Sequence, residues 1–189
     1  MNTLETIAAR RSIRRFKAGP LPDGTLEKIL AAGIQAPSGH NRQPWRFTVV
    51  AGAAHAEMVE VFRSTLAKRR AEGEDVGSAA GTVEAMAGAA VTVFVHHPKG
   101  IHPWVARSEN WEELVDVQST GGAIENMLLA ATELGIGSLW IADVWEAYGP
   151  LNAFLGENGL MVAAVSFGLP DEAPAPRKRR PFEEVVRFL

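Results

Sequence analysis

Apolar side chains recur at helical spacing in several segments of this 189-residue chain, which predicts a helix in each of them. The predicted helices cover residues 3–10, 24–34, 54–71, 111–134 and 145–155. Asp23 is expected to cap the second helix and Pro37 to stop it. The later half of the helix over 111–134 is apolar on nearly every side, so we expect protein to surround it, with a subunit interface as one source of that cover.

Runs of β-branched and aromatic residues predict strands over residues 47–51, 91–95, 138–142 and 160–167. Residues 72–81 are rich in glycine, alanine and acidic residues and are expected to form a mobile connection, and residues 96–110 an irregular excursion. An extended tail begins near residue 173 and ends in an amphipathic segment. Since no repeat and no linker divides the chain, we predict a single domain over residues 1–189 with an α+β fold of helices around a sheet.

The absence of cysteine limits the chemistry of the chain, because it excludes disulfides, thiolate nucleophiles and iron–sulfur or zinc–thiolate sites. His96, His97 and His102 lie close together in the sequence, but without carboxylates at ligand spacing we expect no metal site. The N-terminus shows no basic-then-apolar leader, and no apolar run approaches the ~18 residues of a membrane helix. We therefore expect a cytoplasmic protein with no membrane partner.

Positive charge is concentrated at two points far apart in the sequence. The first block is Arg10-Arg11-Ser12-Ile13-Arg14-Arg15-Phe16-Lys17, and the second is Arg177-Lys178-Arg179-Arg180. With Lys17 left aside, the blocks hold eight of the 19 basic residues, and the other 11 face 22 acidic residues. This distribution indicates that the fold brings both blocks around one small anion. For the first block, the alternative is a solvated basic turn. The second block could be a nucleic-acid binding patch, but the overall acidity of the chain and the prolines that flank the block argue against this.

Arginine suits the binding of a phosphate, because its planar guanidinium donates two parallel hydrogen bonds and keeps its charge. The first block follows a predicted helix and does not open one, so side chains and not a helix N-terminus would hold the anion. Ser12 adds a hydroxyl that can donate to a phosphate or sugar oxygen.

The segment over residues 36–47 has the composition of a polar loop between two prolines. Pro37 and Pro44 fix its ends, and Gly39 permits close approach of the backbone. Ser38, Asn41 and Gln43 supply hydrogen-bonding groups. Such a loop can lie over the face of a planar ligand, or it can be a structural turn between helix and strand.

Taken together, five pieces of sequence resemble the FMN-dependent nitroreductase family, which also includes flavin reductases and dehalogenating members. They are Arg-Arg-Ser-Ile-Arg-Arg-Phe at 10–16, Ala-Pro-Ser-Gly-His-Asn-Arg-Gln-Pro-Trp-Arg-Phe at 36–47, Leu-Gly-Ile-Gly-Ser-Leu-Trp-Ile-Ala at 134–142, Phe-Gly-Leu-Pro at 167–170 and Arg-Lys-Arg-Arg-Pro at 177–181. The pieces occur in the order that the family shows and span nearly the whole chain.

The resemblance implies a nitroreductase-like fold and FMN bound at the interface of a homodimer with an extended C-terminal tail. The residues that it assigns to the cofactor are Arg10, Arg11, Ser12, Arg14, Pro37, Ser38, Gly39, Asn41, Trp140, Ile141, Ala142, Arg177 and Arg179. Residues 10–12 would hold phosphate and ribityl oxygens, and Arg14 would stabilise the reduced flavin from its N1–C2=O edge. Residues 37–41 would come from the partner subunit, and residues 140–142 would pass the N5 side of the ring.

The family pattern in the tail selects Arg177 and Arg179 for the phosphate, although a slip of one residue would select Lys178 and Arg180 instead. The pattern thus leaves the register of the tail open.

The implied activity is that of an NAD(P)H-dependent FMN oxidoreductase. NADH or NADPH would give a hydride to flavin N5, and the electrons would pass to a planar aromatic acceptor such as a nitroaromatic or a quinone. Because the flavin carries this chemistry, we name no acid–base residue. A narrower reaction, such as reductive dehalogenation or heterocycle oxidation, and a flavin-sensing role with little turnover are the alternatives. Residues 72–91 offer no clear equivalent of a polar flavin contact that some members of the family place there. Residues 96–110 match no subgroup, so the acceptor stays open.

Overall fold

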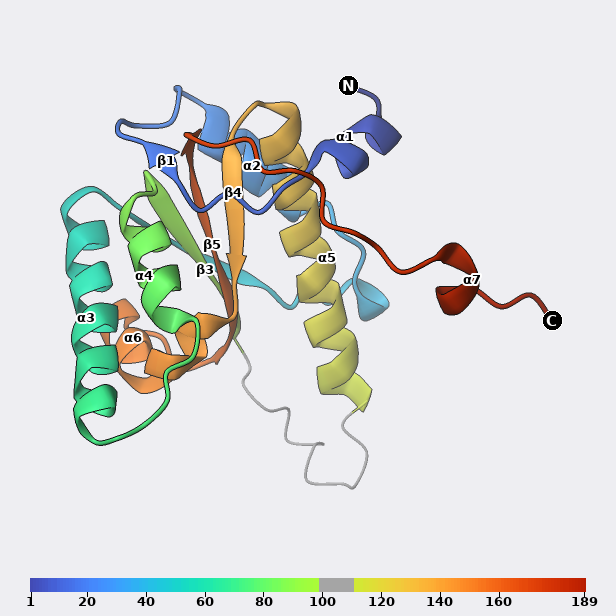
Figure 1. The fold of residues 1–189 in the computed structure, drawn as a ribbon. Coiled ribbons are helices and arrows are strands. Elements are labelled where there is room, and N and C mark those ends of the chain that lie inside the picture. The colour runs from blue at the N-terminus through green and yellow to red at the C-terminus, as the bar shows by residue number, and fades with distance from the viewer. Residues whose placement is uncertain (99–110) are drawn as a thin grey trace.

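The computed structural model describes residues 1–98 and 111–189 and arranges them as a sheet with helices on both faces (Figure 1). The central strand is β5 (Leu160–Pro170), which pairs with β3 (Val91–His97), β4 (Gly137–Ile141) and β1 (Phe16–Lys17). β2 (Arg46–Ala51) pairs with the other side of β3. Every one of these pairs is antiparallel. The predicted α+β fold with a mainly antiparallel sheet is confirmed.

The helices form one layer on each face of the sheet (Figure 1). On one face lie α3 (Gly52–Ala71), α4 (Ala79–Ala87) and α6 (Tyr148–Leu155). On the other lie α2 (Thr25–Gly33) and α5 (Trp111–Glu133), with α1 (Thr3–Ala9) packed against α5. The shorter elements are the 3-10 turns η1 (Gly39–Asn41) and η3 (Asp143–Ala147) and the helix α7 (Phe182–Val185).

Successive side chains of β3 point into two different cores. Phe94 belongs to the core that contains Phe62 of α3, whereas Val93 and Val95 belong to the core that contains Ile124 of α5. All residues of β3 are buried. A strand covered on both faces is apolar without alternation, which explains why this segment could be predicted from its composition.

Two of the predicted helix boundaries need correction. The second helix is capped by Gly24, in the left-handed conformation with φ of 70°, and not by Asp23. The connection predicted over residues 72–81 is wrong in its last part, because α4 begins at Ala79. Buried Ala79 and Val83 are spaced by one helical turn, so the signal was present, but small residues obscured it.

The irregular excursion predicted over residues 96–110 is wrong at its start. His96 and His97 are the last residues of β3 and are buried. Residues 99–110 lie outside the described part of the chain. The sequence also gave no sign of β1, which is only two residues long.

The helix α5 has a fully buried stripe along its length, and its later half is covered more widely. Its buried residues are Asp116, Ser119, Thr120, Ala123, Ile124, Met127, Leu128 and Ala131. In the later half, residues 121–132 are all buried or half-buried, whereas Leu134 is 40% exposed. A subunit interface as a source of further cover stays a prediction. Within the two described ranges, no helix combines the length and the apolar character needed to cross a bilayer.

Two glycines make room for the first cationic block on the sheet. A Cβ placed on Gly168 of β5 would lie 2.7 Å from Cδ1 of Phe16, and one on Gly137 of β4 would lie 3.0 Å from Cγ2 of Ile13. Ile13 itself is buried. Residues 12–17 therefore approach the strands closely because these two positions carry no side chain.

We predict that Gly168→Ala lowers the free energy of unfolding by about 1–3 kcal/mol, because the new methyl group must displace Phe16 near its backbone. Urea unfolding measures the change. Gly81→Ala in α4 is the control, since a Cβ there meets nothing within 4 Å and alanine favours a helix. Equal stability of the Gly168→Ala variant and the wild type would contradict the close packing of Phe16 on β5.

Candidate functional site

A cavity of about 720 Å³ lies where the first cationic block meets the tail, which we define as residues 171–189. The residues that line it are Ile7, Ala8, Arg10, Arg11, Ser12, Arg14, Glu125, Pro174, Ala175, Pro176, Arg177 and Arg179. Five arginines thus face one glutamate, which makes the cavity strongly positive and suited to a small anion. Figure 1 shows the tail leaving β5 and crossing beside the segment that follows α1.

Both cationic blocks contribute to this one cavity, as the charge distribution predicted. Arg177 and Arg179 line it, whereas Lys178 and Arg180 do not. This is the register of the tail that the family pattern selects. That these side chains hold a phosphate stays a prediction.

The first block is held in place by contacts with three elements. Arg11 Nη1 donates to two carbonyl oxygens at the end of α1, at 2.7 and 2.8 Å. Arg10 Nε lies 3.6 Å from a carboxylate oxygen of Glu125 on α5. The N–H of Ile13 donates to the carbonyl of Ser138 on β4 at 2.9 Å, beside a parallel bridge between Ser12 and Ser138. The guanidinium groups therefore project from a backbone that is fixed to the fold.

The sequence analysis missed two carboxylates near this block. Glu125 lines the cavity, and finding it requires knowing how α1 packs on α5. Glu172 accepts backbone N–H groups of Arg14 and Arg15. A signal for Glu172 existed, because it is an acidic residue between the last strand and the second cationic block.

The residues predicted at the N5 side of the ring lie at the end of β4 and differ in exposure. Trp140 is 42% exposed, and a Cβ on Gly121 of α5 would lie 3.8 Å from its ring. The side chain of Ile141 is buried in the core that faces α3, so only its backbone can face a ligand. Ala142 is exposed. None of the three lines the cavity.

The predicted ligand-contacting loop lies apart from the cavity within the same chain. Pro37, Ser38, Gly39 and Asn41 connect α2 to β2, and none of them lines the cavity. Pro37 and Asn41 are exposed, whereas Ser38 and Gly39 are half-buried. The structure thus brings together the residues assigned to the phosphate and leaves those of the loop elsewhere.

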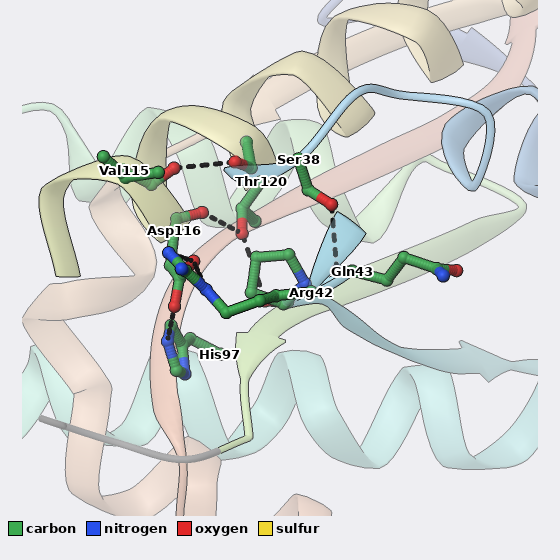
Figure 2. Close-up of polar contacts among 9 residues, drawn as sticks. Ser38, Arg42, Gln43, His97, Val115, Asp116 and Thr120 are labelled. Carbon is green, nitrogen blue, oxygen red and sulfur yellow. Dashed lines mark hydrogen bonds and ion pairs between the residues drawn. The ribbon is translucent and has the colours of Figure 1, made fainter. Parts of the chain in front are cut away.

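A cluster of polar contacts among Arg42, His97 and Asp116 fixes this loop to α5 and β3 (Figure 2). Oδ1 of Asp116 accepts hydrogen bonds from Nε and Nη2 of Arg42 at 3.0 and 2.7 Å. Oδ2 of Asp116 lies 3.1 Å from Nε2 of His97. Asp116 and His97 are almost fully buried. A buried carboxylate requires such partners, because an uncompensated charge in the interior is strongly destabilising.

Two further hydrogen bonds hold the loop (Figure 2). The N–H of Gln43 donates to Oγ of Ser38 at 2.9 Å, and the hydroxyl of Thr120 lies 3.2 Å from the carbonyl of Pro44. The Ser38 oxygen is therefore used within the loop, and its O–H still has the capacity to donate outward.

The loop backbone is strained. His40, Asn41 and Gln43 have φ of 52°, 53° and 49°, a region that costs a residue other than glycine about 1–3 kcal/mol. A Cβ on Gly39 would lie 2.6 Å from Cγ1 of Val115, so a larger residue cannot take its place unless that side chain shifts. Strain of this kind concentrates at functional sites, where the surrounding structure must maintain it.

The histidines considered as metal ligands have protein partners. Nε2 of His96 lies 2.9 Å from Oδ1 of Asn152, and His97 contacts Asp116. His102 lies outside the described residues. Both described histidines are therefore placed in the packing of the sheet.

Residues 7–169 match the sequence model of the nitroreductase family. The chain belongs to this family. An Archaeoglobus fulgidus protein assigned as an NADH dehydrogenase or NAD(P)H nitroreductase is 34% identical over 173 residues, 89% of this chain and 86% of the relative. A Vibrio harveyi protein named NADPH-flavin oxidoreductase is 28% identical over 188 residues, 98% of this chain and 72% of the relative.

The fold of this family member is also similar to that of solved structures. A Desulfovibrio desulfuricans protein assigned as a nitroreductase, in complex with FMN, has a TM-score of 0.76 and 29% sequence identity. The similarity covers 98% of this chain and 96% of the other. The predicted nitroreductase-like fold is confirmed.

We predict that Asp116→Asn lowers the free energy of unfolding of this nitroreductase-family protein by about 3 kcal/mol, because it leaves Arg42 without its charged partner. Urea unfolding measures the loss. Glu60→Gln is the control, since its ion pair with Arg63 on α3 is exposed and is worth about 0.5 kcal/mol or less. If Asp116→Asn lowered the free energy of unfolding by no more than Glu60→Gln does, the contacts of Asp116 would not hold the loop.

Proposed function

We propose that this protein is an FMN-dependent enzyme that uses NADH or NADPH to reduce a planar acceptor, such as a nitroaromatic or a quinone. The observation that carries the proposal is the convergence of both cationic blocks on one cavity, because FMN ends in a phosphate that requires such a site. Two relatives support it, one solved in complex with FMN and one named NADPH-flavin oxidoreductase.

The residues of the cavity fit the phosphate of FMN in charge and in hydrogen-bonding capacity. A phosphate monoester carries about −1.5 to −2 charges near neutral pH, and guanidinium groups bind its oxygens in pairs. Arg10, Arg11, Arg177 and Arg179 would hold the phosphate, and the hydroxyl of Ser12 would donate to a phosphate or ribityl oxygen. Without a bound anion, these arginines repel one another, which favours uptake of the ligand.

When bound, FMN supplies the redox chemistry, because its ring takes a hydride from a nicotinamide and passes electrons to an acceptor. The side chains of the protein bind and orient it. Arg14 lines the same cavity and would bring positive charge toward the ring. Such a charge stabilises the negative charge of the reduced ring and so raises its reduction potential.

We further propose that a second copy of the chain completes the site. Hydrogen bonds of Arg42 and of Ser38 hold the loop, yet residues 37–41 do not line the cavity of their own chain. Exposed Pro37 and Asn41 are available to another molecule. A homodimer would allow the loop of one subunit to lie over the flavin ring bound by its partner, with residues 140–142 on the other side.

Purified protein that is incubated with FMN and then freed of excess ligand should be yellow. Its visible flavin absorption should bleach under anaerobic conditions when NADH or NADPH is added, and should return when a quinone or nitroaromatic is supplied. Protein that takes up no FMN would contradict the proposal. Bound flavin that neither nucleotide reduces would favour a sensing role or another electron donor.

Arg10→Ala and Arg14→Ala should have different effects. Arg10→Ala should raise the dissociation constant of FMN about tenfold or more, because a charge-assisted hydrogen bond is lost. Arg14→Ala should chiefly lower the reduction potential of bound flavin, by about 30 mV, which is ~1.4 kcal/mol for two electrons. Lys178→Ala, which removes a charge that does not line the cavity, is the control. Wild-type affinity and potential in both variants would refute the assigned roles.

A further inference from the structure

The carboxylate of Glu172 fastens the tail to the first cationic block. Oε1 of Glu172 accepts the backbone N–H of Arg14 and, at 3.1 Å, that of Arg15. Oε2 of Glu172 lies 3.6 Å from Nε of Arg15. The Glu172 side chain is only 18% exposed. The hydrogen bond from the Arg14 N–H, followed by that from Arg15, lowers the pKa of Glu172, so the carboxylate is charged at neutral pH.

The contacts of Glu172 continue the pairing of β1 with β5. Phe16 pairs with Pro170, and the N–H of Asp171 donates to the carbonyl of Arg15 at 2.9 Å. The next residue, Glu172, then adds hydrogen bonds from its side chain to the backbone of Arg14 and Arg15. The tail consequently leaves the sheet in a direction set by these contacts, and not as a free end.

From Glu172 the tail runs directly along the cavity. Pro174, Ala175 and Pro176 line it before Arg177 and Arg179 do so. The two prolines restrict the backbone, since each fixes its φ near −65°. A stiff segment with a fixed start has few ways to place the residues that follow, so the position of Glu172 determines where Arg177 and Arg179 lie.

Glu172 does this from outside the lining of the cavity. It is not among the residues that line the cavity, in contrast to Glu125. Its charge faces two backbone N–H groups and Arg15, and the Arg15 side chain does not line the cavity either. The carboxylate thus fixes the backbone of Arg14 and forms its ion pair with a guanidinium group outside the cavity.

We propose that Glu172 is a positioning residue that gives the site its preference for a phosphate-bearing flavin over a phosphate-free one. It does so by holding the tail such that Arg177 and Arg179 face the block at residues 10–14. This inference rests on the proposed function. It adds a residue, Glu172, that does not touch the ligand. It also assigns to that residue the preference for a flavin that carries a phosphate.

The test compares FMN with riboflavin, which carries the same ring and ribityl chain but no phosphate. Glu172→Gln should weaken FMN binding about tenfold and leave riboflavin binding unchanged, because only the phosphate contacts depend on the tail. Asp171→Asn is the matched control, since it removes the same charge one position away at an exposed side chain, and both affinities should stay at the wild-type value. Equal weakening of FMN and riboflavin by Glu172→Gln would overturn the inference, because it would indicate general loosening.

A double-mutant cycle tests the route through the tail. In a variant that carries Arg177→Ala and Arg179→Ala, the further change Glu172→Gln should have no effect on FMN affinity. The same tenfold loss in that background would overturn the inference.

If Glu172→Gln does not fold, Glu172→Asp takes its place, because aspartate keeps the charge and has a shorter side chain. This variant too must reduce the affinity for FMN and not that for riboflavin.

Failure of this inference is distinguishable from failure of the proposed function. Wild-type protein that does not bind FMN contradicts the proposed function. Wild-type protein that binds FMN tightly, together with a Glu172→Gln variant that binds it equally well, overturns the role of Glu172 alone.

Discussion

The attachment of residues 12–17 to the sheet is the constraint on which the rest of the site depends. Ile13 is buried against β4, and Phe16 lies over Gly168 of β5. The tail follows β5 directly. The strand that pairs with the first cationic block therefore also fixes the start of the segment that carries the second cationic block. Like charges gathered in this way repel one another, so the fold must hold them by packing and hydrogen bonds, and an anion then gains from their field.

The loop over residues 38–44 presents a second, separate arrangement. Its strained backbone is maintained by the buried pair of Arg42 and Asp116 and by the close contact of Gly39 with Val115. Neither feature contributes to the cationic cavity of the same chain. We propose that this loop contacts a flavin bound by another copy of the chain, because strain of this kind concentrates at functional sites.

Much of the fold could be predicted from local patterns, because each long helix and strand carries a continuous apolar signal. Short β1 and the Ala-rich α4 lack a strong signal of this kind, and they were missed for that reason. The convergence of the two cationic blocks was predicted from charge alone. The carboxylates that organise the site could not be predicted in the same way, since Asp116 and Glu125 act across contacts that only the packed structure defines.

A crystal structure of the protein with FMN tests the central claim most directly. The account predicts that phosphate oxygens lie within hydrogen-bond distance of Arg10 or Arg11 and, at the same time, of Arg177 or Arg179, with the loop of a second copy over the ring. A phosphate that contacts only one of the two blocks, or that lies outside the cavity, would contradict the account.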